Sequence, residues 1–190
     1  MNFDEVYQLA DKSGSESAFN RDECVALYFL SYLVPPGGLA IEIGLQFGRS
    51  TTVIGAIAKE KNFTFMGIDN WKEDVSPEAK WNVEENLIKQ MGLPIKLVNS
   101  NSKVAWRDIP GIVDGIDLIH IDGDHNYKGV LSDCENYLKH VSKGGFACFD
   151  DYGHDSLPGV YKAVSEYIHK HPEWVFAGRF GNKLGVFRKK

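Results

Sequence analysis

The sequence predicts an α/β protein with a doubly wound, seven-stranded, mostly parallel sheet, helices on both faces and an N-terminal helical extension. Two observations lead to this prediction. Short runs rich in β-branched and aromatic residues alternate with segments of helical periodicity, and an antiparallel hairpin follows at the C-terminal end. The length of 190 residues suits a single domain over 1–190, with the extension at 1–37 and the sheet-containing core at 38–190.

The first five predicted strands are mostly apolar, and most of them end in a glycine or an aspartate. Such runs suit a sheet that is covered on both faces, in which the strands are parallel. They occupy 39–44, 63–69, 95–99, 116–122 and 145–150.

Segments of helical spacing separate these strands. Apolar residues recur at the 3, 4, 7 spacing from Tyr127 to Val141, and Gly144 and Gly145 are expected to close that helix. Another such stripe follows Pro158, whose fixed φ suits the first turn of a helix. Further helices are expected at 19–34, 50–61 and 77–91, with a shorter one at 103–109.

The last two strands are expected to form a hairpin. Residues 174–180 and 184–187 flank Gly181 and Asn182, a pair that is typical of tight β-turns. Five strand–helix units followed by an antiparallel pair give seven strands. This ending differs from the six-stranded order of dinucleotide-binding domains.

The charge and the cysteine content argue against several classes of protein. With 21 Lys and Arg against 26 Asp and Glu, the net charge is −5, which disfavours a nucleic-acid partner held by phosphate neutralisation. The apolar run 26–34 is far shorter than the ~20 residues that span a membrane, and it lies too deep for a signal peptide. Cys24, Cys134 and Cys148 are scattered, which predicts three reduced thiols in a cytoplasmic protein.

A glycine-containing loop follows the first strand, at the edge where open α/β sheets bind ligands. Gly44 and Gly48 let the backbone turn and approach a ligand closely, and the helix near Ser50 points free N–H groups toward an anion such as a carboxylate. No Gly-Lys-Ser/Thr follows, so the loop is not a phosphate-binding P-loop. The GxGxxG fingerprint is also absent, because position 46 is Gln46.

Polar residues follow the second and third strands at the same edge. Asp69 lies 25 residues after Gly44, where a carboxylate can accept the ribose hydroxyls of a nucleotide. Asn70 comes next, and Ser100, after the third strand, suits either a contact to a base edge or the cap of the next helix. A glycine turn with a helix-capping aspartate is the alternative interpretation of this region.

Acidic residues follow the fourth and fifth strands. Asp122 ends one and Asp150 and Asp151 end the other, so the three carboxylates are expected to converge and to need a cation such as Mg²⁺, Mn²⁺ or Ca²⁺. His125 would lie beside that cation, with a pKa suited to proton transfer. The alternative is a turn, an N-cap and a surface histidine, which explains each residue singly but not their common place at strand ends. His120, which alternates within the strand, is expected to be structural.

Three stretches of the chain resemble a known family. They are 42–51, 121–127 followed by Val130 and Asp133, and 144–151. On these stretches the chain resembles class I S-adenosylmethionine-dependent methyltransferases, and more narrowly the small metal-assisted O-methyltransferases of the macrocin and catechol types. The resemblance extends over 38–188 and implies a nucleotide-binding-like core with a seven-stranded sheet.

The resemblance also implies roles for individual residues. Eight residues would bind the cofactor S-adenosylmethionine at its methionine end, at its ribose or beside them. They are Glu42, Gly44, Gly48, Ser50, Asp69, Asn70, Ser100 and Asp122. Asp122, Asp150 and Asp151 resemble the ligands of a divalent cation, with Mg²⁺ the first choice, and His125 resembles the general base. With His125 and Asp122 as catalytic residues, the expected reaction is methyl transfer to a hydroxyl of a sugar, a catechol or another small natural product.

Two other functions remain open from the sequence. One is a nucleotide-dependent oxidoreductase, against which the missing third glycine and the terminal hairpin argue. The other is a non-catalytic protein that binds the cofactor as an accessory. The loop 70–80 and the N-terminal helices are expected to shape the acceptor pocket, and aromatic residues in the first 34 positions suit either a homodimer contact or packing on the sheet.

Overall fold

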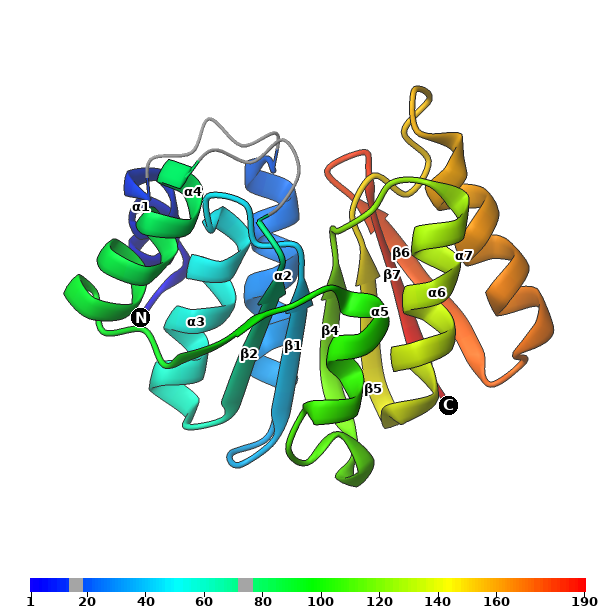
Figure 1. The fold of residues 1–190 in the computed structure, drawn as a ribbon, viewed down its shortest axis with the longest axis horizontal. Coiled ribbons are helices and arrows are strands. Elements are labelled where there is room, and N and C mark those ends of the chain that lie inside the picture. Colours follow the sequence, from blue (N-terminus) through cyan, green and yellow to red (C-terminus); the bar gives the residue numbers. More distant parts are fainter. Residues whose placement is uncertain (14–18, 72–76) are drawn as a thin grey trace.

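The computed structural model describes residues 1–13, 19–71 and 77–190 and contains a seven-stranded sheet with helices on both faces (Figure 1). The strand order is β3-β2-β1-β4-β5-β7-β6. Neighbouring strands from β3 to β5 are parallel, and β7 is antiparallel to both β5 and β6. The predicted fold class is therefore confirmed. The strands are β1 (Leu39–Ile43), β2 (Thr64–Asp69), β3 (Ile95–Asn99), β4 (Ile116–Ile121), β5 (Val141–Phe149), β6 (Trp174–Phe180) and β7 (Leu184–Lys189).

Helices cover the two faces of the sheet as two separate groups. One buried cluster joins the sheet to α1 (Phe3–Lys12), α2 (Arg21–Leu33), α3 (Arg49–Lys61) and the π-helical segment η1 (Asn82–Gln90). The other joins it to α5 (Ser102–Ala105), α6 (Tyr127–Tyr137) and α7 (Pro158–Lys170). Short elements complete the chain: α4 (Pro77–Trp81) and the 3₁₀ turns η2 (Trp106–Asp108), η3 (Ile112–Asp114) and η4 (Leu138–His140).

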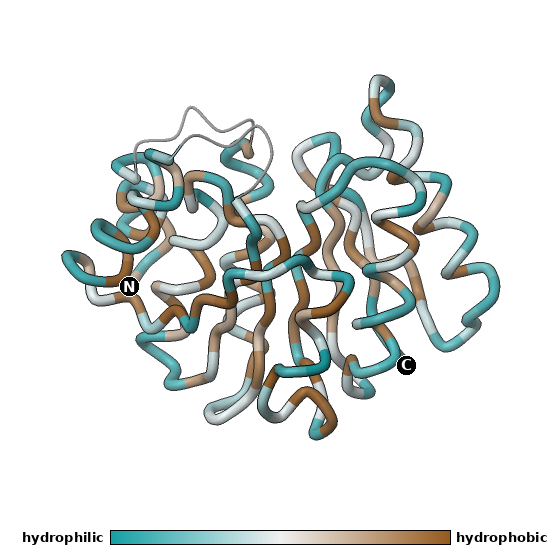
Figure 2. The backbone as a smooth tube through the Cα atoms, in the orientation of Figure 1, coloured by the Kyte–Doolittle hydropathy of each residue, from teal (hydrophilic) through white to brown (hydrophobic). Residues whose placement is uncertain are grey.

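Strand alternation produces these two buried clusters. Ala40 contributes to the cluster under α2 and α3, whereas Leu39 and Ile41 contribute to the cluster under α6. Figure 2 shows hydrophobic residues along the strands in the middle of the molecule and hydrophilic residues on the outer turns. The three cysteines are buried and free. Within the described ranges, no helix is long and apolar enough to cross a membrane.

Two expected helices differ from the observed ones. The helix predicted to reach Val141 ends at Tyr137, and Val141 instead begins β5, where it pairs with Ile116. Gly144 lies inside β5 at φ +87°, next to a shift in the β4–β5 register, so the glycine pair accommodates a bulge rather than a helix end. The helix predicted at 77–91 is divided into the α-helical α4 and the π-helical η1. An apolar stripe predicts which face of a helix is buried, but it does not predict how many residues each turn contains.

A buried ion pair joins β1 to β4 directly below the carboxyl edge of the sheet. Glu42 and His120 are register partners, both are fully buried, and Glu42 Oε1 lies 3.0 Å from His120 Nδ1. Burial lowers the pKa of His120, but the Glu42 carboxylate outweighs burial and the net pKa is raised, which favours the imidazolium. Glu42 Oε2 and His120 Nε2 have no hydrogen-bond partner among the described residues. The pair is therefore an electrostatic contact inside the core.

We expect His120→Ala to lower the free energy of unfolding by about 3–5 kcal/mol, because it leaves the Glu42 carboxylate buried without its partner. Replacing both residues, by Glu42→Met and His120→Leu, is expected to recover most of this loss, because an apolar pair leaves no charge to bury. Urea unfolding followed by circular dichroism measures both variants. A double variant as unstable as His120→Ala would contradict the assignment of a buried ion pair.

Candidate active site

The candidate site lies at the carboxyl edge of the sheet, where β1 and β4 are neighbours although two strands, β2 and β3, lie between them along the chain. The loop after β1 begins with Gly44 at φ +82°, whose N–H donates to the Ile68 carbonyl at 2.9 Å. Gly48 ends the loop and is the N-cap of α3, with no side-chain hydrogen bond to the helix in the described part of the chain. The first turn of α3 therefore leaves backbone N–H groups available at the loop.

The structure gives a different reason for the two loop glycines from the one expected from sequence. A Cβ at position 44 would overlap the carbonyl oxygen of Asp122, and one at position 48 would overlap Leu87 Cδ1. The protein's own backbone at Asp122 and its core at Leu87 therefore leave no room for a side chain at these two positions. The contact at Gly44 also fixes the glycine loop against the start of the acidic loop after β4.

Asp69 anchors the glycine loop. Its Oδ2 accepts the N–H groups of Leu45 and Gln46 at 2.8 and 3.2 Å, and its Oδ1 accepts that of Trp71 at 2.9 Å. The Ser100 N–H donates to the Asp69 carbonyl at 3.1 Å, so Ser100 lies beside Asp69.

The other expected cofactor residues take different positions. Asn70 is half-buried beside Asp69, and Ser50 is buried in the first turn of α3. Glu42 lies below this layer, where its carboxylate contacts His120. Of the loop 70–80, which was expected to shape the acceptor pocket, residues 72–76 lie outside the described part.

The acidic cluster forms as the topology predicts, although its membership differs in part. His125 Nε2 lies 3.4 Å from Asp122 Oδ1 and 3.2 Å from Asp151 Oδ2. One ligand atom from each of these three residues lies within 4.8 Å of the others, which is a spacing that could hold a metal ion. The group found among the described residues does not include Asp150.

Asp150 is paired with a lysine that the sequence interpretation missed. Its Oδ2 accepts a hydrogen bond from Lys183 Nζ at 2.6 Å, and Asp151 Oδ1 accepts one from the same nitrogen at 3.1 Å. Asp150 Oδ1 is buried and has no partner among the described residues. The only feature of the sequence that could have pointed to this contact is that Lys183 directly follows the Gly181-Asn182 turn.

The titratable side chains of the cluster and of the adjacent α2 have shifted pKa values. Burial raises the pKa of Asp122 to about 6, with Asp150 adding to the shift and His125 opposing it. The hydrogen bond to Asp122 raises the pKa of His125. Burial also raises the pKa of Glu23, at the start of α2, to about 7, and Asp150 contributes to that shift. Burial is thus the first cause of the shifts at Asp122 and Glu23, and the nearby Asp150 carboxylate adds to both.

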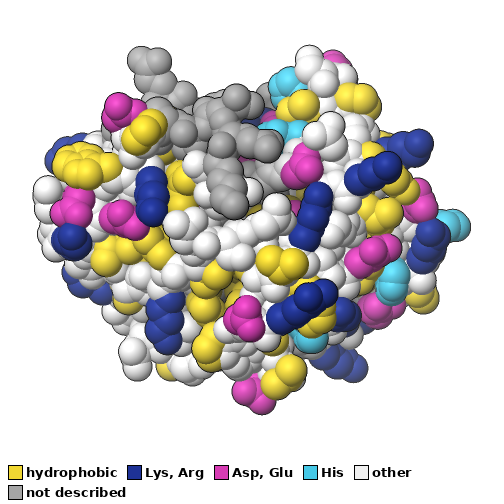
Figure 3. Space-filling model, viewed as in Figure 1, with side chains coloured by type: hydrophobic (Ala, Val, Ile, Leu, Met, Phe, Trp, Pro, Cys, Tyr) yellow, Lys and Arg dark blue, Asp and Glu magenta, His cyan; other side chains and the backbone are white. Residues whose placement is uncertain are grey.

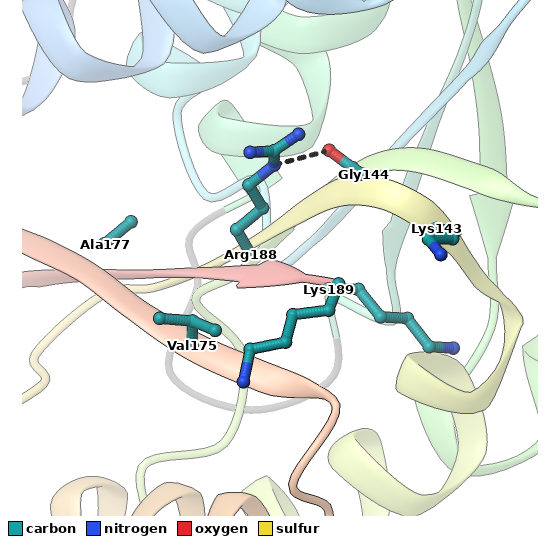
Figure 4. A pocket seen from close by; sticks show the side chains of 7 residues that line it. Lys143, Gly144, Val175, Ala177, Arg188 and Lys189 are labelled. Atoms are coloured by element: carbon teal, nitrogen blue, oxygen red, sulfur yellow. Dashed lines mark hydrogen bonds between the residues drawn. The ribbon is translucent and has the colours of Figure 1, made fainter.

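A groove of about 620 Å³ lies at the opposite end of β5 and β7. Lys143, Val175, Ala177 and Lys189 line it, and Arg188 Nε donates to the Gly144 carbonyl at 3.4 Å (Figure 4). The groove is separate from the acidic cluster, because these residues lie at the start of β5, in the first half of β6 and at the end of β7. On the face shown in Figure 3, side chains of both charges are interspersed.

The packing at Gly44 leads to a prediction with an internal control. Gly37 has a similar φ of +77°, but a Cβ there would meet no described atom within 4 Å, so Gly37→Ala reports only the cost of the backbone conformation. Gly44→Ala is expected to destabilise the protein by about 1–3 kcal/mol more than Gly37→Ala, because it also overpacks the Asp122 carbonyl. Thermal and urea unfolding measure the difference. Equal losses would show that the β1 and β4 loops are not in this contact.

Comparisons with known proteins agree with this geometry. Residues 41–152 match the model of a family described as a methyltransferase domain. Over 138 residues the chain is 32% identical to a protein of Acanthamoeba polyphaga mimivirus that is named only as uncharacterized. That match covers 67% of this chain, which spans 58% of the length of the relative.

Solved structures share the fold. A Podospora anserina methyltransferase bound to S-adenosylhomocysteine (SAH) has a TM-score of 0.71 at 16% identity, covering 99% of this chain and 87% of that one. A TDP-rhamnose 3'-O-methyltransferase of calicheamicin biosynthesis has a TM-score of 0.62 at 17% identity, covering 98% and 92%. The O-methyltransferase NovP has a TM-score of 0.63 at 18% identity, covering 88% and 79%. Because the family match includes both the glycine loop and the acidic cluster, the chain belongs to the methyltransferase-domain family, with the class I S-adenosylmethionine-dependent methyltransferase fold.

Proposed function

We propose that the protein is an O-methyltransferase that transfers a methyl group from S-adenosylmethionine to a hydroxyl of a small molecule, with a divalent cation at the acidic cluster. One observation carries the proposal: His125 lies between Asp122 and Asp151, next to the loop that binds the donor in this fold. The backbone contact between Gly44 and Asp122 makes the two regions neighbours. A donor and an activated acceptor would therefore meet at one edge of the sheet.

The donor supplies an electrophilic methyl group and carries its own leaving group, so the protein has to bind and orient it. Asp69 fits the ribose end, because its Oδ1 accepts a single backbone N–H and keeps a lone pair that can accept a ribose hydroxyl. The first turn of α3, which has no side-chain cap in the described residues, fits the methionine carboxylate. Ser50, Asn70 and Ser100 complete the proposed donor site.

The carboxylates fit a hard divalent cation. Asp122 and Asp151 offer oxygen ligands within reach of each other, and the unpartnered Asp150 Oδ1 offers a third. When bound, such a cation lowers the pKa of an acceptor hydroxyl and fixes its direction. Mg²⁺ is the first choice of metal because all three proposed ligands are carboxylates.

His125 is proposed as the general base. Its side chain is 41% exposed and therefore accessible to an acceptor, while two carboxylates hold its Nε2. In its neutral form the ring would take the proton of the acceptor hydroxyl as the methyl group is transferred, and the two carboxylates would stabilise the imidazolium that results. Such a role is typically worth ~10²–10⁴-fold in rate.

A vicinal diol or a catechol is the acceptor shape that this arrangement favours, because two adjacent oxygens can chelate one cation. Two structural neighbours are named as a TDP-rhamnose 3'-O-methyltransferase and as an O-methyltransferase. These names support a hydroxyl acceptor for the present protein but do not identify the acceptor molecule. A small molecule is preferred over nucleic acid because the chain is acidic. A cytoplasmic location is part of the proposal, supported by the buried free thiols.

The test measures methyl transfer to a panel of sugars, diols and catechols with Mg²⁺ and after chelation. His125→Ala is expected to lower kcat by ~10²–10⁴-fold and to leave SAH affinity within about twofold, because the residue acts on the acceptor proton. The matched control is His169→Ala, an exposed histidine on α7. Full activity in chelator would remove the cation from the mechanism, and undiminished turnover of His125→Ala would remove the base.

A further inference from the structure

Lys183 places an ammonium group inside the acidic cluster. It belongs to the turn between β6 and β7, and its Nζ lies 2.6 Å from Asp150 Oδ2 and 3.1 Å from Asp151 Oδ1. The Lys183 side chain is 13% exposed, and those of Asp150 and Asp151 are 5% and 11% exposed. The contact is therefore shielded from water, unlike a surface ion pair.

The turn that carries Lys183 is held in place on both sides. Asn20, the N-cap of α2, donates from Nδ2 to the Gly181 carbonyl at 2.8 Å. On the other side, Leu184 is fully buried and pairs with Phe180, so β7 begins directly after the lysine. These contacts fix the backbone from which the Lys183 side chain reaches the two carboxylates.

Asp151 lies between Lys183 and His125. Its Oδ1 accepts from Lys183, and its Oδ2 lies 3.2 Å from His125 Nε2. A cation bound to Asp151 and Asp150 would meet the Lys183 ammonium on the same carboxylates. Two like charges at such separation repel, and the repulsion is strong where water is excluded.

We propose that Lys183 is a built-in competitor of the divalent cation. It offsets one of the two negative charges of Asp150 and Asp151, weakens cation binding by at least tenfold, and moves away from Asp150 when the cation binds. This inference rests on the proposed cation site. It adds Lys183 as a residue that lowers the affinity of the site for its metal. A cation that is already chelated by an acceptor would bind there more readily than a free cation.

Mn²⁺ titration followed by electron paramagnetic resonance tests the inference without any activity assay. Lys183→Met is expected to bind Mn²⁺ at least tenfold more tightly than the wild type, whereas Lys183→Arg, which keeps the charge, should stay within threefold. The matched control is Lys170→Met, which removes an exposed ion pair to Glu166 on α7. Circular dichroism checks that each variant is folded.

The outcomes separate the two proposals. Mn²⁺ binding that Lys183→Met leaves unchanged or weakens would overturn the role of Lys183 and leave the cation site intact. If neither the wild type nor Lys183→Met binds Mn²⁺, both the cation site and the role of Lys183 are overturned. A purely structural lysine would lower stability in Lys183→Met with no gain in Mn²⁺ affinity.

A measurement on the wild-type protein keeps the inference testable if the Lys183 variants fail to fold. Saturating Mg²⁺ is expected to increase hydrogen exchange of the backbone amides at 181–184, because the lysine then loses its contact with Asp150. Unchanged exchange in this turn under saturating Mg²⁺ would overturn the proposed displacement.

Discussion

Carboxylates that end neighbouring parallel strands are forced together at one edge of the sheet, and the site depends on how their repulsion is balanced. In this protein the balance comes from two side chains on different elements. His125 lies between Asp122 and Asp151, and Lys183 lies between Asp150 and Asp151. The acidic residues can therefore stay close together.

The same edge of the sheet ties the donor loop to this cluster. Gly44 packs against the backbone of Asp122, and Asp69 holds the loop through backbone N–H groups. Below them, the Glu42–His120 pair joins β1 to β4 inside the core. A displacement of either loop would therefore change the packing of the other.

Much of this arrangement follows from local patterns in the sequence. Apolar runs ending in Gly or Asp predict the strands and their common edge, and the Gly-Asn turn predicts the hairpin. Three features depend on pairing between distant segments and were missed or misassigned. Lys183 reaches Asp150 because β7 pairs with β5, where Phe149 is the partner of Gly185. Val141 suits a helix stripe and a strand equally, and only its pairing with Ile116 decides. The contact of Glu42 with His120 was missed, because it follows from the β1–β4 register.

The central claim is that a donor site and a cation site share one edge of the sheet, with His125 beside both. A crystal structure of the protein soaked with SAH and Mn²⁺, with anomalous scattering used to locate the metal, tests this most directly. The account predicts a single manganese peak bound by Asp122 and Asp151, with the ribose of SAH on Asp69. Manganese bound outside this cluster, or SAH bound away from Asp69 and the glycine loop, would contradict it.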